Sequence, residues 1–507
     1  MGFNDQVFVM SFRSTAKKMA VGLLAWLLMA DLAAQPPRER WVDSVFNQLS
    51  TPEKIGQLFM LSVSPDMDEA AIQALERQVN TNHIGGILYI NGPKPNQRGI
   101  TKRLQSASEI PLIMAMGRPF SSGVYNDSLY AFPTILMQGA IADDSLIFRF
   151  GAEIGRQMKL MGIHMNFIPA NLAGNTNLEG SISYGENRFS VASKALAFWR
   201  GLRAEGVLAT AQYFPVQGLS VTTMGRGLPS LQLTVDSLQA YPFKVLFRNG
   251  IPAVMPASTD LPLFYSKRKT AMKNVFSSAT LSASFAGEWI RSNMNYEGLI
   301  MIDVENMARS SDKFKNGDAE LFAFRAGNDM LVTSTNINAA IRKMKRLIRK
   351  EPRYLPFLDQ SVRKILSIKY DAGLGTPPDA QADVISSPIQ SRLLREQMYR
   401  ATTTVIANKK NILPVQTLDN KIFTCLIAGD STRGNAFAKQ IAKYVPIKVR
   451  YVNGAEPGLQ FEADDNLQHV IIAAIFPEAS PEVINVLMTA LQEVRINRDV
   501  VICDIGS

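Results

Sequence analysis

Short apolar runs alternate with amphipathic segments between residues 44 and 370, and this alternation limits the folds open to the chain. Most of the apolar runs are nearly continuous, which is typical of strands buried on both faces of a parallel sheet. The predicted strands cover residues 55–61, 84–90, 111–116, 164–168, 208–214, 253–258, 298–303 and 329–333, with amphipathic helices between them at 143–161, 191–205 and 283–294 among others. Eight strands with interleaved helices predict a (β/α)8 TIM-type barrel. A doubly wound open sheet is the alternative.

A second, smaller parallel α/β domain is predicted after the barrel. The chain between residues 371 and 390 is rich in glycine, proline and alanine, and we place a domain linker at 376–390. The domain itself is expected at 391–507, with helices at 391–401, 435–445 and 481–496 and strands at 402–407, 422–427, 447–452, 469–476 and 500–505. Because parallel sheets are normally covered on both faces, and the chain ends directly after a strand, we expect this domain to be incomplete.

The first 34 residues have the layout of a secretory signal peptide. Arg13, Lys17 and Lys18 precede an apolar run at 19–30, and small residues follow it around Ala33. The run is too short to span a bilayer comfortably. We therefore expect an exported protein, periplasmic or extracellular, whose barrel occupies residues 35–375 and which has no stable membrane insertion after cleavage. A retained membrane anchor is the alternative.

The overall composition is that of an ordinary globular protein, with 46% hydrophobic and 19% charged residues, and the net charge is +10. The densest basic run, residues 342–350, has Met344, Leu347 and Ile348 at helical spacing, which predicts an amphipathic helix with a solvated basic face. An exported chain without a recognition motif is not expected to bind nucleic acid. Weak attraction to an anionic envelope surface is compatible with its charge.

The two cysteines, Cys425 and Cys503, each lie inside an apolar run that is typical of a strand. We interpret them as two buried free thiols, and a disulfide between them is the alternative.

Candidate catalytic groups are sought at the ends of the predicted strands, because a barrel of this type holds its active site at the carboxyl ends of its strands. These ends are poor in ionisable groups except after the sixth and seventh strands. Asp303 directly follows the apolar run Gly-Leu-Ile-Met-Ile of the seventh strand. A carboxylate there suits a nucleophile or an electrostatic stabiliser, and the alternative role is an N-cap for the following helix.

A series of motifs, taken in chain order, is similar to one enzyme family. They lie at residues 54–60, 83–87, 162–169, 183–187, 214–229 and 298–307. These segments resemble glycoside hydrolase family 3, and within it the bacterial β-N-acetylhexosaminidases. The resemblance implies a retaining glycosidase acting on a carbohydrate of the β-linked N-acetylglucosamine type, with no cofactor and no metal ion. It also implies that Asp303, which matches the family aspartate at the end of the seventh strand, stands at the nucleophile position.

The chain departs from the family pattern where the family protonates the leaving group. Gln212 and Tyr213 replace a Lys-His pair, and residues 223–225 read Thr-Met-Gly where the family has Asp-Ser-His. No histidine lies between His164 and His469, so the family acid/base is missing. Loss of a general acid costs about 10²–10⁴-fold in rate, and we expect hydrolysis to be lost or much reduced.

Sugar-binding positions of the family are replaced as well. Gly117 and Leu172 stand in place of aspartates, Ile182 in place of an arginine and Ser258 in place of a histidine. These changes remove charge-assisted hydrogen bonds to sugar hydroxyls. The alternative function is therefore a non-catalytic barrel that serves as a glycan-binding or scaffolding module for a further domain.

Four other ionisable residues are candidates for a replacement acid or base, and for each of them a structural role is preferred. We interpret Glu305 as a solvent-facing helix residue, Glu186 as a loop residue that forms a hydrogen bond, His164 as a core histidine and His83 as a residue of the opposite rim.

Overall fold

The computed structural model of the chain divides after Thr403 into two compact units, which are described separately here. The structure describes residues 36–64, 66–90, 96–117, 132–172, 183–215, 239–257, 284–305, 314–333, 337–375, 388–408, 411–419, 421–452, 468–476, 479–494 and 499–504. The expected signal peptide lies outside these residues, and so does most of the expected linker. Helix α16 begins at Pro388, inside the stretch expected to be a linker, and belongs to the first unit.

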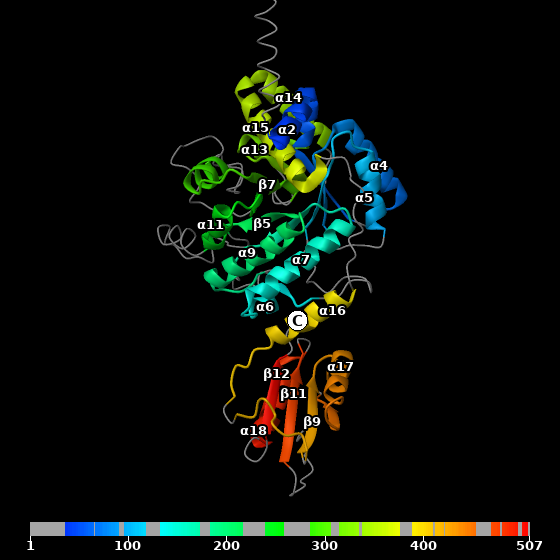
Figure 1. Cartoon of the computed structure of the whole chain (residues 1–507), viewed down its shortest axis with the longest axis vertical. Coiled ribbons are helices and arrows are strands. Elements are labelled where there is room, and N and C mark those ends of the chain that lie inside the picture. The colour runs from blue at the N-terminus through cyan, green and yellow to red at the C-terminus, as the bar shows by residue number, and fades with distance from the viewer. Residues whose placement is uncertain are drawn as a thin grey trace, which may run out of the picture. The chain divides into compact units, whose positions relative to one another are not determined.

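The first unit contains a closed barrel of eight parallel strands in chain order, surrounded by helices (Figure 1). The strands are β1 (Phe59–Val63), β2 (Gly86–Tyr89), β3 (Ile113–Met116), β4 (Met165–Pro169), β5 (Leu208–Phe214), β6 (Ala253–Pro256), β7 (Leu299–Asp303) and β8 (Met330–Thr333). The closing pair is β1 with β8, in the register Met60 to Val332. The predicted barrel is confirmed, and the open-sheet alternative is excluded.

Helices cover the outer face of the barrel, and their buried side chains form one hydrophobic core with those of the strands. They are α2 (Pro37–Gln48), α3 (Thr51–Gln57), α4 (Glu69–Asn82), α5 (Gln97–Ser106), α6 (Ile135–Gly139), α7 (Asp144–Leu160), α9 (Arg188–Ala204), α11 (Tyr241–Arg248), the π-helical segment η5 (Ser284–Asn293), α13 (Asp318–Arg325), α14 (Ile337–Lys350), α15 (Leu355–Lys369) and α16 (Pro388–Thr402).

The strand predicted at 55–61 is wrong over its first three residues, which are helical. Helix α3 ends at Gln57, and β1 begins only at Phe59. The cause is a capping box: the Ser50 backbone N–H donates to the Glu53 carboxylate at 2.7 Å, and Pro52 lies in the first turn. These local signals outweigh the apolar character of residues 55–61.

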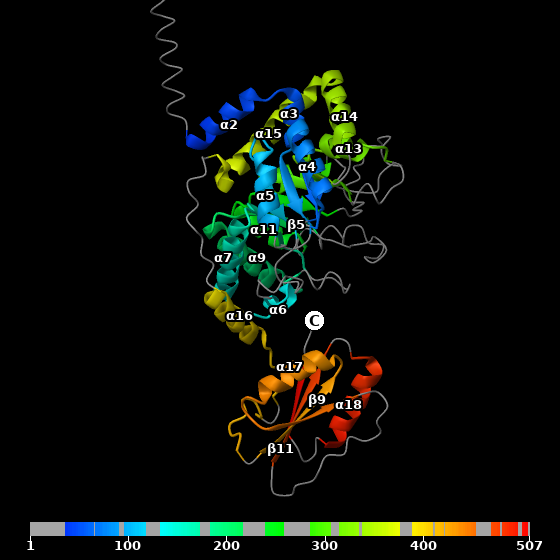
Figure 2. The same cartoon turned by 90° about the vertical axis from the view of Figure 1, so that its right-hand side faces the viewer.

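The second unit is a four-stranded parallel sheet in the order β10-β9-β11-β12. Its elements are β9 (Lys421–Ala428), α17 (Ser431–Ile441), β10 (Ile447–Tyr451), β11 (Gln468–Ile475), α18 (Pro481–Val494) and β12 (Asp499–Asp504). Alternate strand residues face opposite helices: Leu426 packs with Leu487 of α18, and Cys425 packs with Ala438 of α17. Figure 2 shows this sheet with α17 and α18 beside it. The predicted second, smaller parallel sheet is confirmed.

The strand predicted at 402–407 is wrong. Helix α16 continues to Thr402, and residues 403–408 form neither helix nor strand. Val405 and Ile406 are 55% and 93% exposed, so their β-branched side chains have no sheet to pack on. Propensity for a strand has no effect without a neighbouring strand, because β preference reflects packing rather than the backbone alone.

Both cysteines of the second unit are free thiols, as predicted, but only Cys425 is buried, and Cys503 is partly exposed. Cys425 lies on β9 and Cys503 on β12, and β11 separates the two strands.

A buried polar cluster closes the amino end of the barrel. The Lys369 ammonium donates to Gln57 Oε1 at 2.6 Å, and Gln57 Nε2 donates to the His83 carbonyl at 2.5 Å. His164 Nδ1, just before β4, accepts from the Met114 N–H at 3.1 Å. Burial lowers the pKa of Lys369 to about 7 and, together with the Lys369 charge, lowers the pKa of His164 to about 4. His83 and His164 thus lie at the end opposite Asp303.

We predict that Lys369 makes the barrel more stable at alkaline pH. The pKa of Lys369 is about 7 in the folded protein, against about 10.4 in an unfolded chain. Between these two pKa values the unfolded state binds more protons than the folded state, so the contribution of Lys369 to the free energy of unfolding rises with pH. This contribution is lowest below pH 7. The free energy of unfolding of the barrel, measured by urea titration, should therefore rise by on the order of 4 kcal/mol more from pH 7 to pH 10 in the wild type than in Lys369→Met.

The matched control for this substitution is Lys345→Met, which changes an exposed lysine of α14. The free energy of unfolding of Lys345→Met should rise between pH 7 and pH 10 by the same amount as that of the wild type. The same rise in Lys369→Met would contradict the lowered pKa of Lys369.

Candidate functional site

The inner face of the barrel is identified by a contact across its interior. Thr210 Oγ1 of β5 lies 3.1 Å from Met165 Sδ of β4 and 3.5 Å from Met301 Sδ of β7. Strands β5 and β7 are separated by β6, so this contact crosses the barrel. Side chains alternate along a strand, and Gln212 and Asp303 therefore face inward two residues further along. Both stand at the carboxyl end, where barrels of this type hold their active sites.

Asp303 is the last residue of β7 and is only partly buried, in contrast to the four buried residues before it. Val304 and Glu305, which follow it, are helical. Asp303 therefore occupies a strand end and, at the same time, the position before a helical segment. This geometry is compatible with both roles considered for it, a reacting carboxylate and an N-cap.

The end of β5 is held in an irregular conformation beside the rim. The Gln212–Tyr213 and Phe214–Pro215 peptide bonds are cis, and the pairing with β6 shifts register between Gln212 and Phe214. Gln212 is only 9% exposed. The Phe214 ring packs outward, 4.7 Å from the ring of Trp289. The buried Gln212 and the partly buried Tyr213 therefore stand where the regular pairing of β5 with β6 is interrupted.

Asn171 anchors this strand end to the segment that follows β4. Its Oδ1 accepts from the Tyr213 N–H at 2.5 Å, and its carbonyl accepts from Ser183 Oγ at 2.6 Å. Ser183 Oγ in turn accepts from the Gly185 N–H at 3.1 Å, where Gly185 adopts a positive φ of 127°. The two segments are 42 residues apart, so no local pattern indicated the contact.

The remaining sequence-predicted positions are only partly described. Gly117 directly follows β3, and a Cβ built there would lie 3.5 Å from Leu88 Cδ1, an ordinary van der Waals distance. Among the residues that the structure describes, none would clash with a Cβ at this position. Leu172 is buried and Glu186 is exposed. Ile182, Ser258 and residues 216–238, which include 223–225, lie outside the described residues.

An exposed aromatic cluster lies at the same end of the barrel and was missed from the sequence. The Arg188 guanidinium lies 4.7 Å from the Phe189 ring and 5.3 Å from the Tyr241 ring, and the two rings meet edge to face at 5.0 Å. Arg188 and Tyr241 begin α9 and α11, the helices that follow β4 and β5. Phe189 remains 55% exposed, so its ring is available to an apolar ligand surface.

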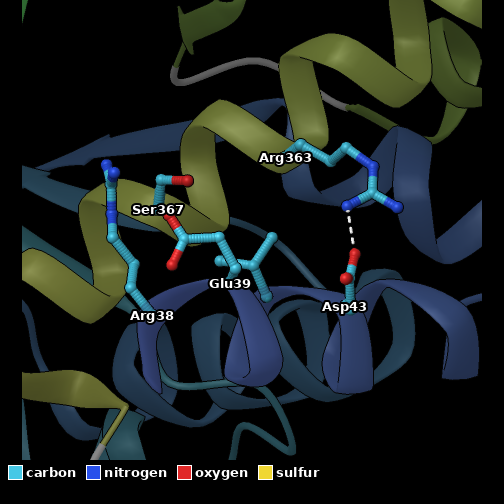
Figure 3. Close-up of a pocket in the computed structure, with 6 residues that line it drawn as sticks. Arg38, Glu39, Asp43, Arg363 and Ser367 are labelled. Carbon is cyan, nitrogen blue, oxygen red and sulfur yellow. Dashed lines mark hydrogen bonds and ion pairs between the residues drawn. The ribbon is translucent and has the colours of Figure 1, made fainter. Parts of the chain in front are cut away.

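A surface hollow elsewhere on the barrel does not belong to this site. Figure 3 shows it between α2 and α15, where Asp43 and Arg363 point toward each other and form an ion pair at 2.5 Å. Arg38, Glu39 and Ser367 also line it. These residues lie on outer helices, and none belongs to the inner face of a strand. Among the described residues, no group of three His, Cys, Asp or Glu side chains could hold a metal ion.

The sequence matches a family model described as the glycosyl hydrolase family 3 N terminal domain over residues 50–368. A beta-N-acetylglucosaminidase/beta-glucosidase of Cellulomonas fimi is 23% identical over 410 residues, covering 76% of this chain and 71% of that protein. The beta-hexosaminidase A of Pseudoalteromonas piscicida is 23% identical over 481 residues, covering 85% and 80%.

Solved structures share the fold. A beta-glucoside phosphorylase superimposes with a TM-score of 0.69 at 17% identity, covering 93% of this chain and 92% of that chain. A glycoside hydrolase family 3 beta-N-acetylglucosaminidase from Paenibacillus superimposes with a TM-score of 0.60 at 17% identity, covering 89% and 98%.

We predict that Asn171→Ala destabilises the barrel, because it removes the acceptor of the Tyr213 N–H next to a buried strand end. An orphaned buried donor costs about 1–3 kcal/mol. Urea unfolding of Asn171→Ala and of Asn80→Ala, which truncates an exposed asparagine of α4, provides the comparison. Equal stability of the two variants would contradict the anchoring role of Asn171.

Proposed function

This chain belongs to glycosyl hydrolase family 3, and we propose that it binds a glycan of the β-linked N-acetylglucosamine type while hydrolysing it slowly or not at all. The binding site is the carboxyl end of the barrel. Support comes from relatives named as beta-N-acetylglucosaminidase and beta-hexosaminidase. The observation that carries the proposal is Asp303, an inward-facing carboxylate at the end of β7.

Asp303 is the proposed nucleophile. In a retaining glycosidase, one carboxylate attacks the anomeric carbon and forms a glycosyl-enzyme, while a second group protonates the departing oxygen. A water molecule then attacks the glycosyl-enzyme and releases the sugar, while the second group accepts a proton from this water. The inward direction inferred for Asp303 from the alternation of side chains along β7 supports this first function.

The second function is the one that we propose to be impaired. Gln212 is a carboxamide, which does not release a proton near neutral pH, and it stands where the family has a lysine. Tyr213 stands where the family has a histidine, and a phenol with an ordinary pKa of about 10 is poorly matched to proton transfer at neutral pH. A leaving group that needs protonation is therefore expected to depart about 10²–10⁴-fold more slowly than with a matched acid.

The alternative is a barrel that binds glycans without any hydrolysis. The exposed ring of Phe189, held against Tyr241 and Arg188 at the same end of the barrel, favours it. Such a ring offers an apolar face to the C–H groups of a sugar without contributing to bond cleavage. In this case Asp303 would contribute only hydrogen bonds to hydroxyls.

We also propose that residues 1–34 direct export to the periplasm or the cell exterior. The support is the basic segment followed by a short apolar run and small residues. None of the described helices has both the length and the apolar character required to cross a bilayer.

The decisive assay compares two β-N-acetylglucosaminides with the purified chain. One carries an aryl leaving group that departs without protonation, and the other carries an alkyl or sugar leaving group. We expect slow turnover of the aryl substrate that disappears in Asp303→Asn, and far slower turnover of the other substrate. Equal background rates for the wild type and Asp303→Asn would contradict the catalytic role of Asp303. Chitooligosaccharide binding in the absence of turnover would then support the binding module.

We predict that Gly117→Asp strengthens glycan binding, because it restores a charged acceptor at a family sugar-binding position where a Cβ would clash with none of the described residues. A hydrogen bond to a charged group contributes about 1.5–3 kcal/mol, so the Kd for a chitooligosaccharide should fall by about tenfold or more. Calorimetric titration measures the change. Gly117→Asn is the isosteric control and should give a smaller gain, and an unchanged Kd for both variants would contradict the position of the sugar.

A further inference from the structure

One side of α14 carries a row of exposed basic side chains: Arg342, Lys345, Arg346, Arg349 and Lys350. Their spacing of three and four residues places them on neighbouring turns of one helix side. We call these five residues the basic row. The opposite side of α14 packs on the barrel through its buried residues, Ile337, Ala340, Met344, Leu347 and Ile348.

No acidic side chain neutralises the basic row in the part of the chain that the structure describes. Lys343, on the same helix, is paired with Asp318 at 2.5 Å. Arg103 of α5 is likewise paired, with Glu69 at 2.8 Å and Glu76 at 2.9 Å. For the five members of the basic row, by contrast, the described residues supply no ion pair, and α14 itself contains no aspartate or glutamate.

The helix dipole accounts for only part of this arrangement. Basic residues in the last turn of a helix are stabilised by its C-terminal partial charge, and this applies to Arg349 and Lys350. The effect fades beyond that turn. Arg342, Lys345 and Arg346 extend the row over ~12 Å of helix at 1.5 Å per residue, where they gain nothing from the dipole and repel one another.

The shape of the basic row selects the kind of partner. The five side chains radiate from a convex helix surface, and the hollow between α2 and α15 includes none of them. A small anion needs donors that converge on it, which a convex row does not offer. In a dense layer of laterally mobile negative charges, by contrast, individual charges can move beneath each basic side chain.

We propose that the basic row docks the protein peripherally on a bilayer rich in anionic phospholipid. Each basic residue near such a surface strengthens binding on the order of fivefold, so five together give on the order of a thousandfold. The apolar side of α14 is buried against the barrel and does not enter the acyl chains, unlike that of an interfacial amphipathic helix. Docking is therefore electrostatic and sensitive to salt. It is independent of the activity proposed for the barrel mouth.

The test is co-sedimentation of the full chain with vesicles. Vesicles of phosphatidylcholine with phosphatidylglycerol are compared with vesicles of phosphatidylcholine alone, at about 0.1 M and about 1 M salt, where the Debye length is ~10 Å and ~3 Å. We expect binding to the anionic vesicles at the lower salt only. Equal binding to both vesicles, or binding that persists at high salt, overturns the proposal.

The variant Lys345→Glu/Arg346→Glu/Arg349→Glu should lower vesicle binding by a hundredfold or more. Arg77→Glu/Arg98→Glu/Lys102→Glu is the matched control: it changes the same total charge at exposed positions of α4 and α5 and should retain most of the binding. Equal loss in both variants would mean that net charge alone drives adsorption, and it would overturn the role of α14.

Two further measurements keep the test decisive. Thermal unfolding checks that each variant folds, and the milder Lys345→Gln/Arg349→Gln replaces the triple variant if it does not fold. Duplex DNA is added as a competitor. Displacement of the protein from the vesicles by an equivalent phosphate concentration of DNA, at every salt, would identify nucleic acid as the preferred partner and overturn the membrane assignment.

Discussion

The hydrogen-bonded pairing of β8 with β1 is the constraint on which the rest of the first unit depends. The Leu331 N–H donates to the Leu58 carbonyl at 2.7 Å, and the register continues through Met60 and Val332. Closure removes both edges of the sheet, so every barrel strand pairs with a neighbour on each side. It also fixes the pleat of every strand, since a shift by one residue would exchange the inner and outer faces. The inward direction of Asp303 and Gln212 follows from this closure.

The two ends of the barrel differ in how their polar side chains are buried and hydrogen-bonded. At the amino end, buried polar groups satisfy one another: Asp329 accepts from Ser361 Oγ at 2.9 Å and from the Ile300 N–H at 2.9 Å, and it is also paired with Arg291. Such a network adds rigidity, because every member is bonded. At the carboxyl end, Asp303 is partly exposed, which its proposed contact with a ligand requires. The division agrees with the general rule that barrels react at this end and gain stability at the other.

The proposed loss of hydrolysis does not require a loss of fold. The described positions that differ from the family, such as Gly117 and Gln212, lie at the carboxyl ends of strands, and the closed barrel is formed with these residues in place. The barrel can therefore retain a glycan site while the proton donor is replaced. The basic row of α14 is a separate surface on an outer helix, and its proposed membrane contact uses charge alone.

The apolar runs alone were enough to predict where most barrel strands lie, because a near-continuous apolar run is typical of a strand covered on both faces. The run at residues 55–61 is the exception, since its first three residues are helical. It also placed Asp303 at a strand end, since that position depends only on where the apolar run stops. The capping box of Ser50 and Glu53 is a local pattern that the strand prediction did not use, and the helix that it starts extends to Gln57.

The contacts that hold the carboxyl end of the barrel together could not be predicted from the sequence. The bond from Tyr213 to Asn171 joins residues 42 positions apart. The packing of Tyr241 against Arg188 and Phe189 joins two different helices, α11 and α9. The exposed coil at Val405 and Ile406, where a strand was expected, has the same origin. Each depends on which segments meet in space, and a single sequence fixes local preference but not the partner that a side chain or strand finds.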